Sequence, residues 1–335
     1  MPQTLFVATT PGLEPALAEE LSEFGLSGRE VPGGVELNTP DGAYRAVNLY
    51  SRIASRVLLR VAAVAHPNEL SKLSLAPYGQ AFRLELAGGV GRFKDALQRL
   101  AGGGPLLHAR LDDGRCVLSV DTSGELLHFR GYRQEIGRAP LRETLAAGIL
   151  RLAGWRPGEA LWDVMCGSGT ILIEAAEQGA GLAPGRARNF AFEAFPSHDE
   201  AAWKALPREK LPALTSVFGS DLNAGALGTA RRNAKRAGVL PRLTLERLDA
   251  TKLPQRAGPG LVIANLPYGK RVGEKPQLAA LYRGLGAAVR RLGPAWRYAF
   301  LLEEGALHLG LPFQRTFAVN NGGLRCELVV GRLEA

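Results

Sequence analysis

A short apolar segment that runs into a glycine-rich turn constrains the fold of this chain more than any other feature. The segment 160–164 is apolar except for Asp163, and Met-Cys-Gly-Ser-Gly-Thr at 165–170 follows it directly. A helix is expected next. In open parallel sheets a strand, a tight turn and a helix in this order form a ligand site at the carboxyl end of the strand. We therefore expect an α/β fold with a nucleotide-type cofactor at this turn.

Further strands alternate with helices in residues 156–335, which favours a parallel, doubly wound sheet. These strands are expected at 216–220, 243–246, 261–264 and 297–302. The order then changes, because strands at 313–319 and 324–333 flank a turn that is too short for a crossover and forces an antiparallel hairpin. Five parallel strands and a terminal hairpin make seven, the arrangement of the Rossmann-like class I methyltransferase sheet.

The first 65 residues predict a small α+β module of the ferredoxin-like kind, in the order β-α-β-α-β. Strands are expected at 5–9, 35–37 and 56–64. The first helix has an apolar stripe at Leu13, Leu17, Leu21 and Phe24. The second helix is expected to start after Asp41, acting as its N-cap.

Residues 66–133 predict a second module, and residues 134–155 a linker with a helix at about 141–152. Within the second module we expect strands at 82–86, 107–111 and 116–120 and a helix at 92–100. Nothing in it looks catalytic, because it lacks clustered acids, a His pair or an activated nucleophile. Such a module usually holds a large substrate; an oligomerisation or purely structural domain is the alternative.

The glycine turn contains the residues that a cofactor with a negatively charged end requires. Gly167 and Gly169 let the backbone turn tightly and approach a ligand without a Cβ in the way. Ser168 and Thr170 lie at the start of the following helix, where free N–H groups and the helix dipole favour a carboxylate. The methionine carboxylate of S-adenosylmethionine fits there, and a pyrophosphate would fit too. A dinucleotide is disfavoured, since Leu172 occupies the third glycine position of its fingerprint.

Acidic residues follow three successive strands. Asp163 lies near the end of the first, Asp221 follows the second, where acids bind ribose hydroxyls, and Asp249 after the third could accept from an adenine amino group. Each acid alone could equally be a helix N-cap, but together they favour S-adenosylmethionine. The predicted cofactor-binding residues are Asp163, Met165, Cys166, Gly167, Ser168, Gly169, Thr170, Asp221, Leu222, Asp249, Ala250 and Asn265.

The segment Asn265-Leu266-Pro267-Tyr268 after the fourth strand predicts the chemistry. The exocyclic amine of guanine or adenine is conjugated with its ring, so two acceptors must hold it with its lone pair toward the methyl donor. The Asn265 side-chain oxygen and the Leu266 carbonyl are the natural acceptors, and Pro267 favours an extended segment. Tyr268 offers a flat face, and stacking is worth about 1–3 kcal/mol per base. We expect orientation to dominate catalysis, with no covalent intermediate.

The bulk composition adds limits on partners and location. The net charge of +9 suggests an anionic partner, although a solvated basic surface would give the same value. Cys116, Cys166 and Cys326 are too scattered for a disulfide framework or a cysteine zinc site and suit a reducing cytoplasm. No membrane span, signal peptide or His-based metal site is indicated. We expect a cytoplasmic monomer without bound metal.

Five segments together resemble the THUMP-domain RNA guanine-N2 methyltransferases, over essentially the full chain. They are LHFRGYR at 127–133, APLRETLA at 139–146, DVMCGSGTILIEA at 163–175, NFAFE at 189–193 and NLPYGKR at 265–271. The resemblance implies a ferredoxin-like domain at 1–65, a THUMP domain at 66–133 that helps to grip tRNA, and a class I methyltransferase domain at 156–335 that uses S-adenosylmethionine.

Within that family the chain is most similar to the tRNA enzymes that methylate the guanosine N2 in the acceptor stem, at position 6 in the best-known members. This similarity depends on the compactness of the chain and on the leucine at position 266. Lys270 and Arg271 directly follow the Asn265–Tyr268 segment and are predicted to contact RNA phosphates, and Arg133 is also predicted to contact RNA.

Alternatives to the tRNA assignment remain open at this point. They are guanine-N2 methylation of ribosomal RNA, adenine-N6 methylation, and an RNA-binding factor with a vestigial cofactor pocket. An NAD-dependent oxidoreductase is disfavoured by Leu172 and the terminal hairpin.

Overall fold

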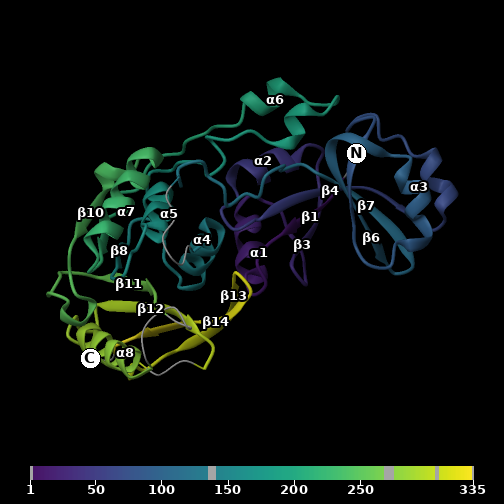
Figure 1. Cartoon of the computed structure of the whole chain (residues 1–335). Coiled ribbons are helices and arrows are strands. Elements are labelled where there is room, and N and C mark those ends of the chain that lie inside the picture. The colour runs from purple at the N-terminus through teal and green to yellow at the C-terminus, as the bar shows by residue number, and fades with distance from the viewer. Residues whose placement is uncertain (1–2, 135–140, 268–274, 306–308, 334–335) are drawn as a thin grey trace. The chain divides into compact units, whose positions relative to one another are not determined.

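The structure, a computed structural model, describes residues 3–134, 141–267, 275–305 and 309–333 (Figure 1). The chain divides into two compact units, which are named here by the terminus that each contains. The N-terminal unit comprises residues 1–10, 17–128 and 184–208, and the C-terminal unit comprises residues 11–16, 129–183 and 209–335. Each unit is therefore assembled from segments that are separated in the sequence.

The strands of the N-terminal unit form one sheet of seven strands in the order β2-β3-β1-β4-β7-β6-β5. Strand β4 pairs antiparallel with β7, so the segments 1–65 and 66–133 contribute to a continuous sheet. The strands are β1 (Gln3–Ala8), β2 (Gly28–Val31), β3 (Gly34–Thr39), β4 (Arg56–Val64), β5 (Phe82–Leu86), β6 (Ala101–Asp112) and β7 (Arg115–Asp121).

Two local expectations for the first 65 residues were wrong. Strand β2 is an additional strand, and it was missed because three of its four residues are exposed and give no alternating pattern. The N-cap of α2 (Ala43–Tyr50) is Gly42, with φ 79°, rather than Asp41. The Asp41 carboxylate instead accepts a hydrogen bond from the Gln3 side chain.

The remaining helices before residue 130 are short. They are α1 (Glu14–Glu23), α3 (Lys94–Gln98), and the 3-10 helices η1 (Pro67–Lys72) and η2 (Gly91–Phe93). The helix expected at 92–100 thus begins as a single 3-10 turn and continues as α3.

The segment 184–208 completes the core of the N-terminal unit. It contains η3 (Ala191–Ala194) and α6 (Glu200–Lys204). Phe192 is fully buried, and the rings of Tyr44, Phe190 and Trp203 lie 5.0–5.4 Å from its ring between centroids. Ser197 donates a hydrogen bond to the Pro77 carbonyl. This segment between the first two strands of the C-terminal sheet is therefore a structural cover for the other unit.

The C-terminal unit contains a second sheet of seven strands, in the order β10-β9-β8-β11-β12-β14-β13. The first five of these strands are parallel, and β14 pairs antiparallel with both β12 and β13. The predicted class I methyltransferase sheet is thereby confirmed. The strands are β8 (Ala160–Asp163), β9 (Val217–Ser220), β10 (Leu243–Glu246), β11 (Gly260–Asn265), β12 (Trp296–Glu303), β13 (Arg315–Asn321) and β14 (Leu324–Arg332).

Helices cover both faces of the second sheet. Asp163 and Gly219 are register partners, and a Cβ at Gly219 would meet the Leu172 side chain of α5 (Thr170–Gly179). Trp162, the residue before Asp163 in β8, belongs to the same buried cluster as Tyr282 of α8 (Lys275–Arg290). Because successive residues of a strand point to opposite faces, α5 and α8 lie on opposite faces, and the sheet is doubly wound.

Two further helices belong to the C-terminal unit, α4 (Glu143–Leu152) and α7 (Ala224–Ala237). The side chain of Asn223 caps the start of α7, and Gly238 ends it in the left-handed conformation. A 3-10 helix, η5 (Ala250–Lys252), follows β10.

Among the described residues, no helix is long and apolar enough to cross a bilayer. The His, Cys, Asp and Glu side chains of the same residues form no group of three that could bind a metal ion.

Candidate active site

Four strands bring the predicted site residues to one edge of the C-terminal sheet. Asp163 of β8 is in register with Gly219 of β9 and Ile263 of β11. Asn265 is the last residue of β11, and Asp221 directly follows the last residue of β9, so each lies two positions beyond the register partner of Asp163. Strand order reverses between β8 and β11, and open α/β sheets bind ligands at such a point, beyond the carboxyl ends of the strands.

The glycine turn leaves room for a ligand at one residue and none at the other. Gly169 is the N-cap of α5 with φ 86°, and a Cβ there would lie 3.0 Å from the Ala230 Cβ. Gly167 has φ 53°, and a Cβ there would meet no atom of the described residues within 4 Å. The Asn233 side chain of α7 donates to the Ser168 carbonyl at 3.2 Å. Gly169 is therefore required for packing, whereas Gly167 borders open space.

Backbone hydrogen bonds hold the turn against the end of β9. The Cys166 N–H donates to the Ser220 carbonyl at 3.0 Å, and the Gly167 N–H donates to the Asp221 carboxylate at 2.9 Å. The second Asp221 oxygen accepts from the Asn223 N–H at 2.8 Å. Asp221 thus joins the glycine turn to the start of α7, in addition to its predicted role at the ribose.

The Asp163 carboxyl is buried in an unfavourable electrostatic environment. Its residue is 2% exposed, and Oδ1 accepts one hydrogen bond, from the Met165 N–H at 3.2 Å. Burial, reinforced by the nearby Asp221 carboxylate, raises the pKa of Asp163 to about 8. A positively charged group bound at this edge would favour the ionised carboxylate.

Cys166 and Asp249 have local structural explanations. Burial and the neighbouring acids Asp163 and Asp221 raise the pKa of the Cys166 thiol well above its usual value, so it is an unreactive thiol at neutral pH. Asp249 caps η5 and accepts from the Thr251 N–H and hydroxyl, and these bonds lower the pKa of its carboxyl. Hence Asp249 remains ionised, and its adenine contact stays a prediction, as does that of the buried Ala250.

The Leu222 side chain lies beside Asp221 and is 61% exposed. An exposed apolar side chain next to Asp221, whose contact with a ribose stays a prediction, suits contact with a flat, apolar ring face.

The described part of the Asn265-Leu266-Pro267 segment presents an unused acceptor. The Asn265 Oδ1 atom is buried and has no hydrogen-bond partner within the described residues. The Leu266 N–H donates to the Leu301 carbonyl of β12 at 2.9 Å, and the Leu266 side chain is buried. A buried acceptor without a donor costs about 1–3 kcal/mol, so a ligand donor at this atom would be favoured.

Three predicted residues, Tyr268, Lys270 and Arg271, lie outside the described residues. Their expected contacts with a base and with phosphates stay predictions.

Arg133 is bound within the protein, close to the glycine turn. Its guanidinium donates to the Leu141 carbonyl and to the Thr170 hydroxyl, and it forms an ion pair with Glu143 at 3.1 Å. Thr170 is the first residue of α5. These contacts assign Arg133 a role in holding the start of α5, and its expected RNA contact stays a prediction.

A second arginine reaches the same helix one turn later. The Arg130 Nε donates to the Glu174 carboxylate at 3.3 Å, and both side chains are almost completely buried. Sequence reasoning missed this pair, although both residues lie in the segments that carry the family resemblance. Thr170 and Glu174 are four residues apart and therefore lie on one face of α5. This spacing could have indicated that two nearby arginines, Arg130 and Arg133, contact that face.

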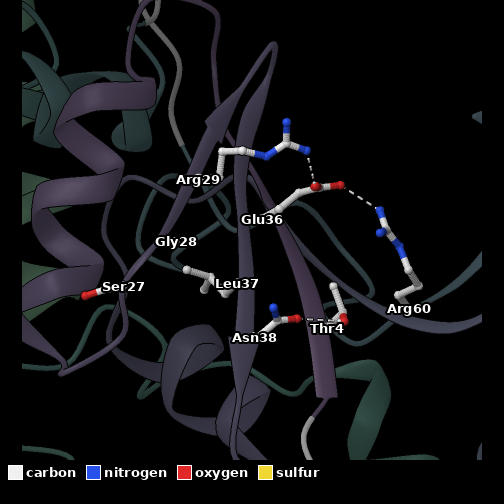
Figure 2. A pocket seen from close by; sticks show the side chains of 8 residues that line it. All are labelled: Thr4, Ser27, Gly28, Arg29, Glu36, Leu37, Asn38 and Arg60. Carbon is white, nitrogen blue, oxygen red and sulfur yellow. Dashed lines mark hydrogen bonds and ion pairs between the residues drawn. The ribbon is translucent and has the colours of Figure 1, made fainter.

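A separate hollow of about 330 Å³ lies in the N-terminal unit and is not part of this edge (Figure 2). Glu36 at its rim forms ion pairs with Arg29 at 2.9 Å and with Arg60 at 2.6 Å. Although burial opposes it, these arginines lower the pKa of Glu36. The one acid that lines the hollow, Glu36, is thus paired with two arginines, so its carboxylate is held as an ion-pair partner and is not available as a catalytic base.

Taken as donors and acceptors, the edge of the C-terminal sheet fits S-adenosylmethionine. The N-terminal end of α5 suits a carboxylate, the acids Asp163 and Asp221 suit a cation and ribose hydroxyls, and Gly167 allows close approach. The Asn265 Oδ1 atom has no hydrogen-bond partner within the described residues, so it suits a donor from a second molecule. Fold and site together define a class I methyltransferase.

Comparison with known proteins identifies the family. Residues 130–309, more than half of the chain, match the RMKL-like methyltransferase domain, and residues 4–58 match the RlmL ferredoxin-like domain. The chain belongs to the RMKL-like methyltransferase family. This membership supports S-adenosylmethionine as its cofactor and confirms the ferredoxin-like start of the chain. The THUMP assignment of residues 66–133 stays a prediction.

Curated relatives carry a ribosomal RNA name. The ribosomal RNA large subunit methyltransferase K/L of Chromohalobacter salexigens is 35% identical over 382 residues, covering 98% of this chain and 52% of the relative. That of Methylococcus capsulatus is 36% identical and covers 98% and 51%. The chain thus spans about half the length of the curated relatives it matches.

Solved structures match over the full chain. A possible methylase from Clostridium difficile 630 has a TM-score of 0.89 and 28% identity, covering 100% of this chain and 99% of the other. The protein SMU.472, complexed with SAH, has a TM-score of 0.88, 26% identity and the same coverage. TrmN from Thermus thermophilus has a TM-score of 0.73 at 23% identity, covering 99% and 100%, which shows a shared fold alone.

Proposed function

We propose that this chain transfers a methyl group from S-adenosylmethionine to the exocyclic N2 of a guanosine in RNA. The observation that carries the proposal is the buried Asn265 Oδ1, which lacks a donor within the described residues at the edge that carries the glycine turn. S-adenosylmethionine supplies an activated methyl group on a sulfonium, and SAH, bound in SMU.472, is what remains after donation. The protein's task is then to orient the amine.

Asn265 and Leu266 are proposed to hold that amine. The Asn265 Oδ1 and the Leu266 carbonyl would each accept one N–H of the base, which directs the nitrogen lone pair toward the donor. Leu266 is held by its own N–H bond to Leu301, so its carbonyl has a defined direction. Tyr268 is proposed to stack on the base, and Lys270 and Arg271 to contact phosphates.

Large-subunit ribosomal RNA is the favoured substrate between the two RNA candidates. The relatives that are 34–36% identical carry that name, whereas the likeness to TrmN is one of fold. The tRNA acceptor stem, which the sequence resemblance predicts, is the second candidate. Transcribed 23S ribosomal RNA and transcribed tRNA, each incubated with labelled S-adenosylmethionine, distinguish them when the modified nucleoside is identified by mass spectrometry. Methylation of adenine in either RNA would reject the guanine assignment.

The role of Asn265 is tested by Asn265→Ala. The variant loses an acceptor that orients the amine, so kcat is expected to fall about a hundredfold or more. A suitable control is Asn320→Ala, because the Asn320 oxygen accepts from Gly323 in the hairpin turn and should leave kcat within about twofold of the wild type. Calorimetric titration with S-adenosylmethionine shows whether each variant still binds the cofactor. Wild-type kcat in Asn265→Ala would reject the proposed role.

A further inference from the structure

Pro267 is held by a tyrosine that lies fifteen residues further along the chain. The Tyr282 hydroxyl of α8 donates a hydrogen bond to the Pro267 carbonyl at 3.0 Å. Pro267 has no N–H, so this carbonyl is its only backbone hydrogen-bonding group. The bond therefore joins α8 to the segment that carries Asn265 and Leu266.

Tyr282 is well placed to act as a permanent donor. Its side chain is fully buried, in the same core cluster as Leu266. Burial, with smaller contributions from Glu303 and Cys326, raises the pKa of Tyr282 to about 12. The phenol is therefore protonated at neutral pH and keeps its hydrogen for the Pro267 carbonyl.

The segment is thus fixed at successive points from different elements. β12 accepts from the Leu266 N–H, the core buries the Leu266 side chain, and α8 donates to Pro267. Only the last of these contacts is a side-chain hydrogen bond, so it can be removed by deleting a single oxygen atom.

We infer that Tyr282 is a positioning residue for methyl transfer, which fixes the direction of the Asn265 and Leu266 acceptors by holding the Pro267 carbonyl. This inference rests on the proposed function. Rates of oriented reactions are sensitive to small displacements, and a shift of 1 Å can cost about a hundredfold. Loss of the hydroxyl should therefore affect the chemical step more than cofactor binding.

The test compares Tyr282→Phe with Tyr298→Phe in the full chain. Tyr298 is a matched control, because it is equally buried, belongs to the same core cluster, and its hydroxyl has no hydrogen-bond partner within the described residues. Measurements are kcat and KM with whichever of transcribed 23S ribosomal RNA and tRNA the wild type methylates, the calorimetric Kd for S-adenosylmethionine, and Tm.

For Tyr282→Phe we expect kcat to fall about tenfold to a hundredfold, with the Kd for S-adenosylmethionine changed less than about threefold. Tyr298→Phe should retain kcat. Equal kcat in the two variants would overturn the inference, and so would a Tyr282→Phe protein that loses cofactor affinity and Tm together with kcat, since that pattern is a general loss of structure. If Asn265→Ala is inactive while Tyr282→Phe is fully active, the proposed function stands and only the positioning role fails.

Discussion

At the scale of single residues, the buried Asp163 carboxyl gives the site an electrostatic preference for a positively charged ligand group. A carboxyl with one backbone donor and another acid nearby is more stable protonated than ionised. Its pKa of about 8 lies well above the unfolded value of 3.8. Between these values the folded state binds more protons than the unfolded state, so the unfolding free energy decreases as pH rises through this range and levels off above it.

Replacing this acid by its neutral isostere gives a prediction that does not depend on activity. Without cofactor, Asp163→Asn should be close to the wild type in unfolding free energy below about pH 4, exceed it progressively as the pH rises, and exceed it most near pH 9. Each pKa unit corresponds to about 1.4 kcal/mol, so a gap on the order of a few kcal/mol is expected. Denaturant unfolding at several pH values measures it. A gap that is constant with pH would contradict the assignment.

At the scale of elements, the turn between β8 and α5 uses its two glycines for different purposes. Both have positive φ, where a residue with a Cβ is strained by about 1–2 kcal/mol. Only Gly169 also packs closely, against Ala230 of α7. Within the part of the chain that the structure describes, no atom lies within 4 Å of a Cβ placed at Gly167, as expected where a ligand approaches the backbone.

This difference predicts separate outcomes for two substitutions. Gly169→Ala should lower Tm more than Gly167→Ala, because it forces α7 to move. Gly167→Ala should instead weaken S-adenosylmethionine binding more than its small loss of stability explains, by about tenfold or more. Differential scanning fluorimetry and calorimetry measure both quantities. Unchanged cofactor affinity in Gly167→Ala would show that the ligand does not approach there.

The elements themselves were largely predictable, because alternation and turn chemistry are local. Strand β10 has the bounds expected from sequence, and Asp163 and Asn265 lie at one edge of the sheet, as the predicted parallel strands imply. Contacts between distant segments were not predictable in this way. Nothing near Tyr282 in the sequence indicates Pro267 as its partner, and nothing near Arg133 indicates its contacts with Thr170 and Glu143.

At the scale of the whole molecule, the two units are interleaved along the chain. The family match to the methyltransferase domain extends over residues 130–309, yet residues 184–208, which lie inside it, belong to the N-terminal unit. The sequence alone did not indicate a role for this segment. Its aromatic residues pack against rings more than a hundred positions upstream, as Phe192 does against Tyr44.

Consequently, a substitution inside the methyltransferase match should destabilise the other unit. Phe192→Ala removes a fully buried ring and should cost about 3–5 kcal/mol. Limited proteolysis should then cut first within residues 17–128, while S-adenosylmethionine binding persists. The buried Phe300 of β12 provides the comparison, because Phe300→Ala should weaken cofactor binding instead. First cleavage of Phe192→Ala within residues 209–335 would contradict the assignment of the segment.

Because that aromatic segment lies late in the sequence, it also affects how the N-terminal unit folds during synthesis on the ribosome. The seven strands of the first sheet have all been synthesised by residue 121, but Phe192 and Trp203 emerge only after residues 129–183 have been made. During this interval the Tyr44 ring of α2 lacks the Phe192 ring that packs against it, and exposed apolar surfaces are prone to aggregation. A chain truncated after residue 128 would never receive this segment, so its apolar surface would stay exposed.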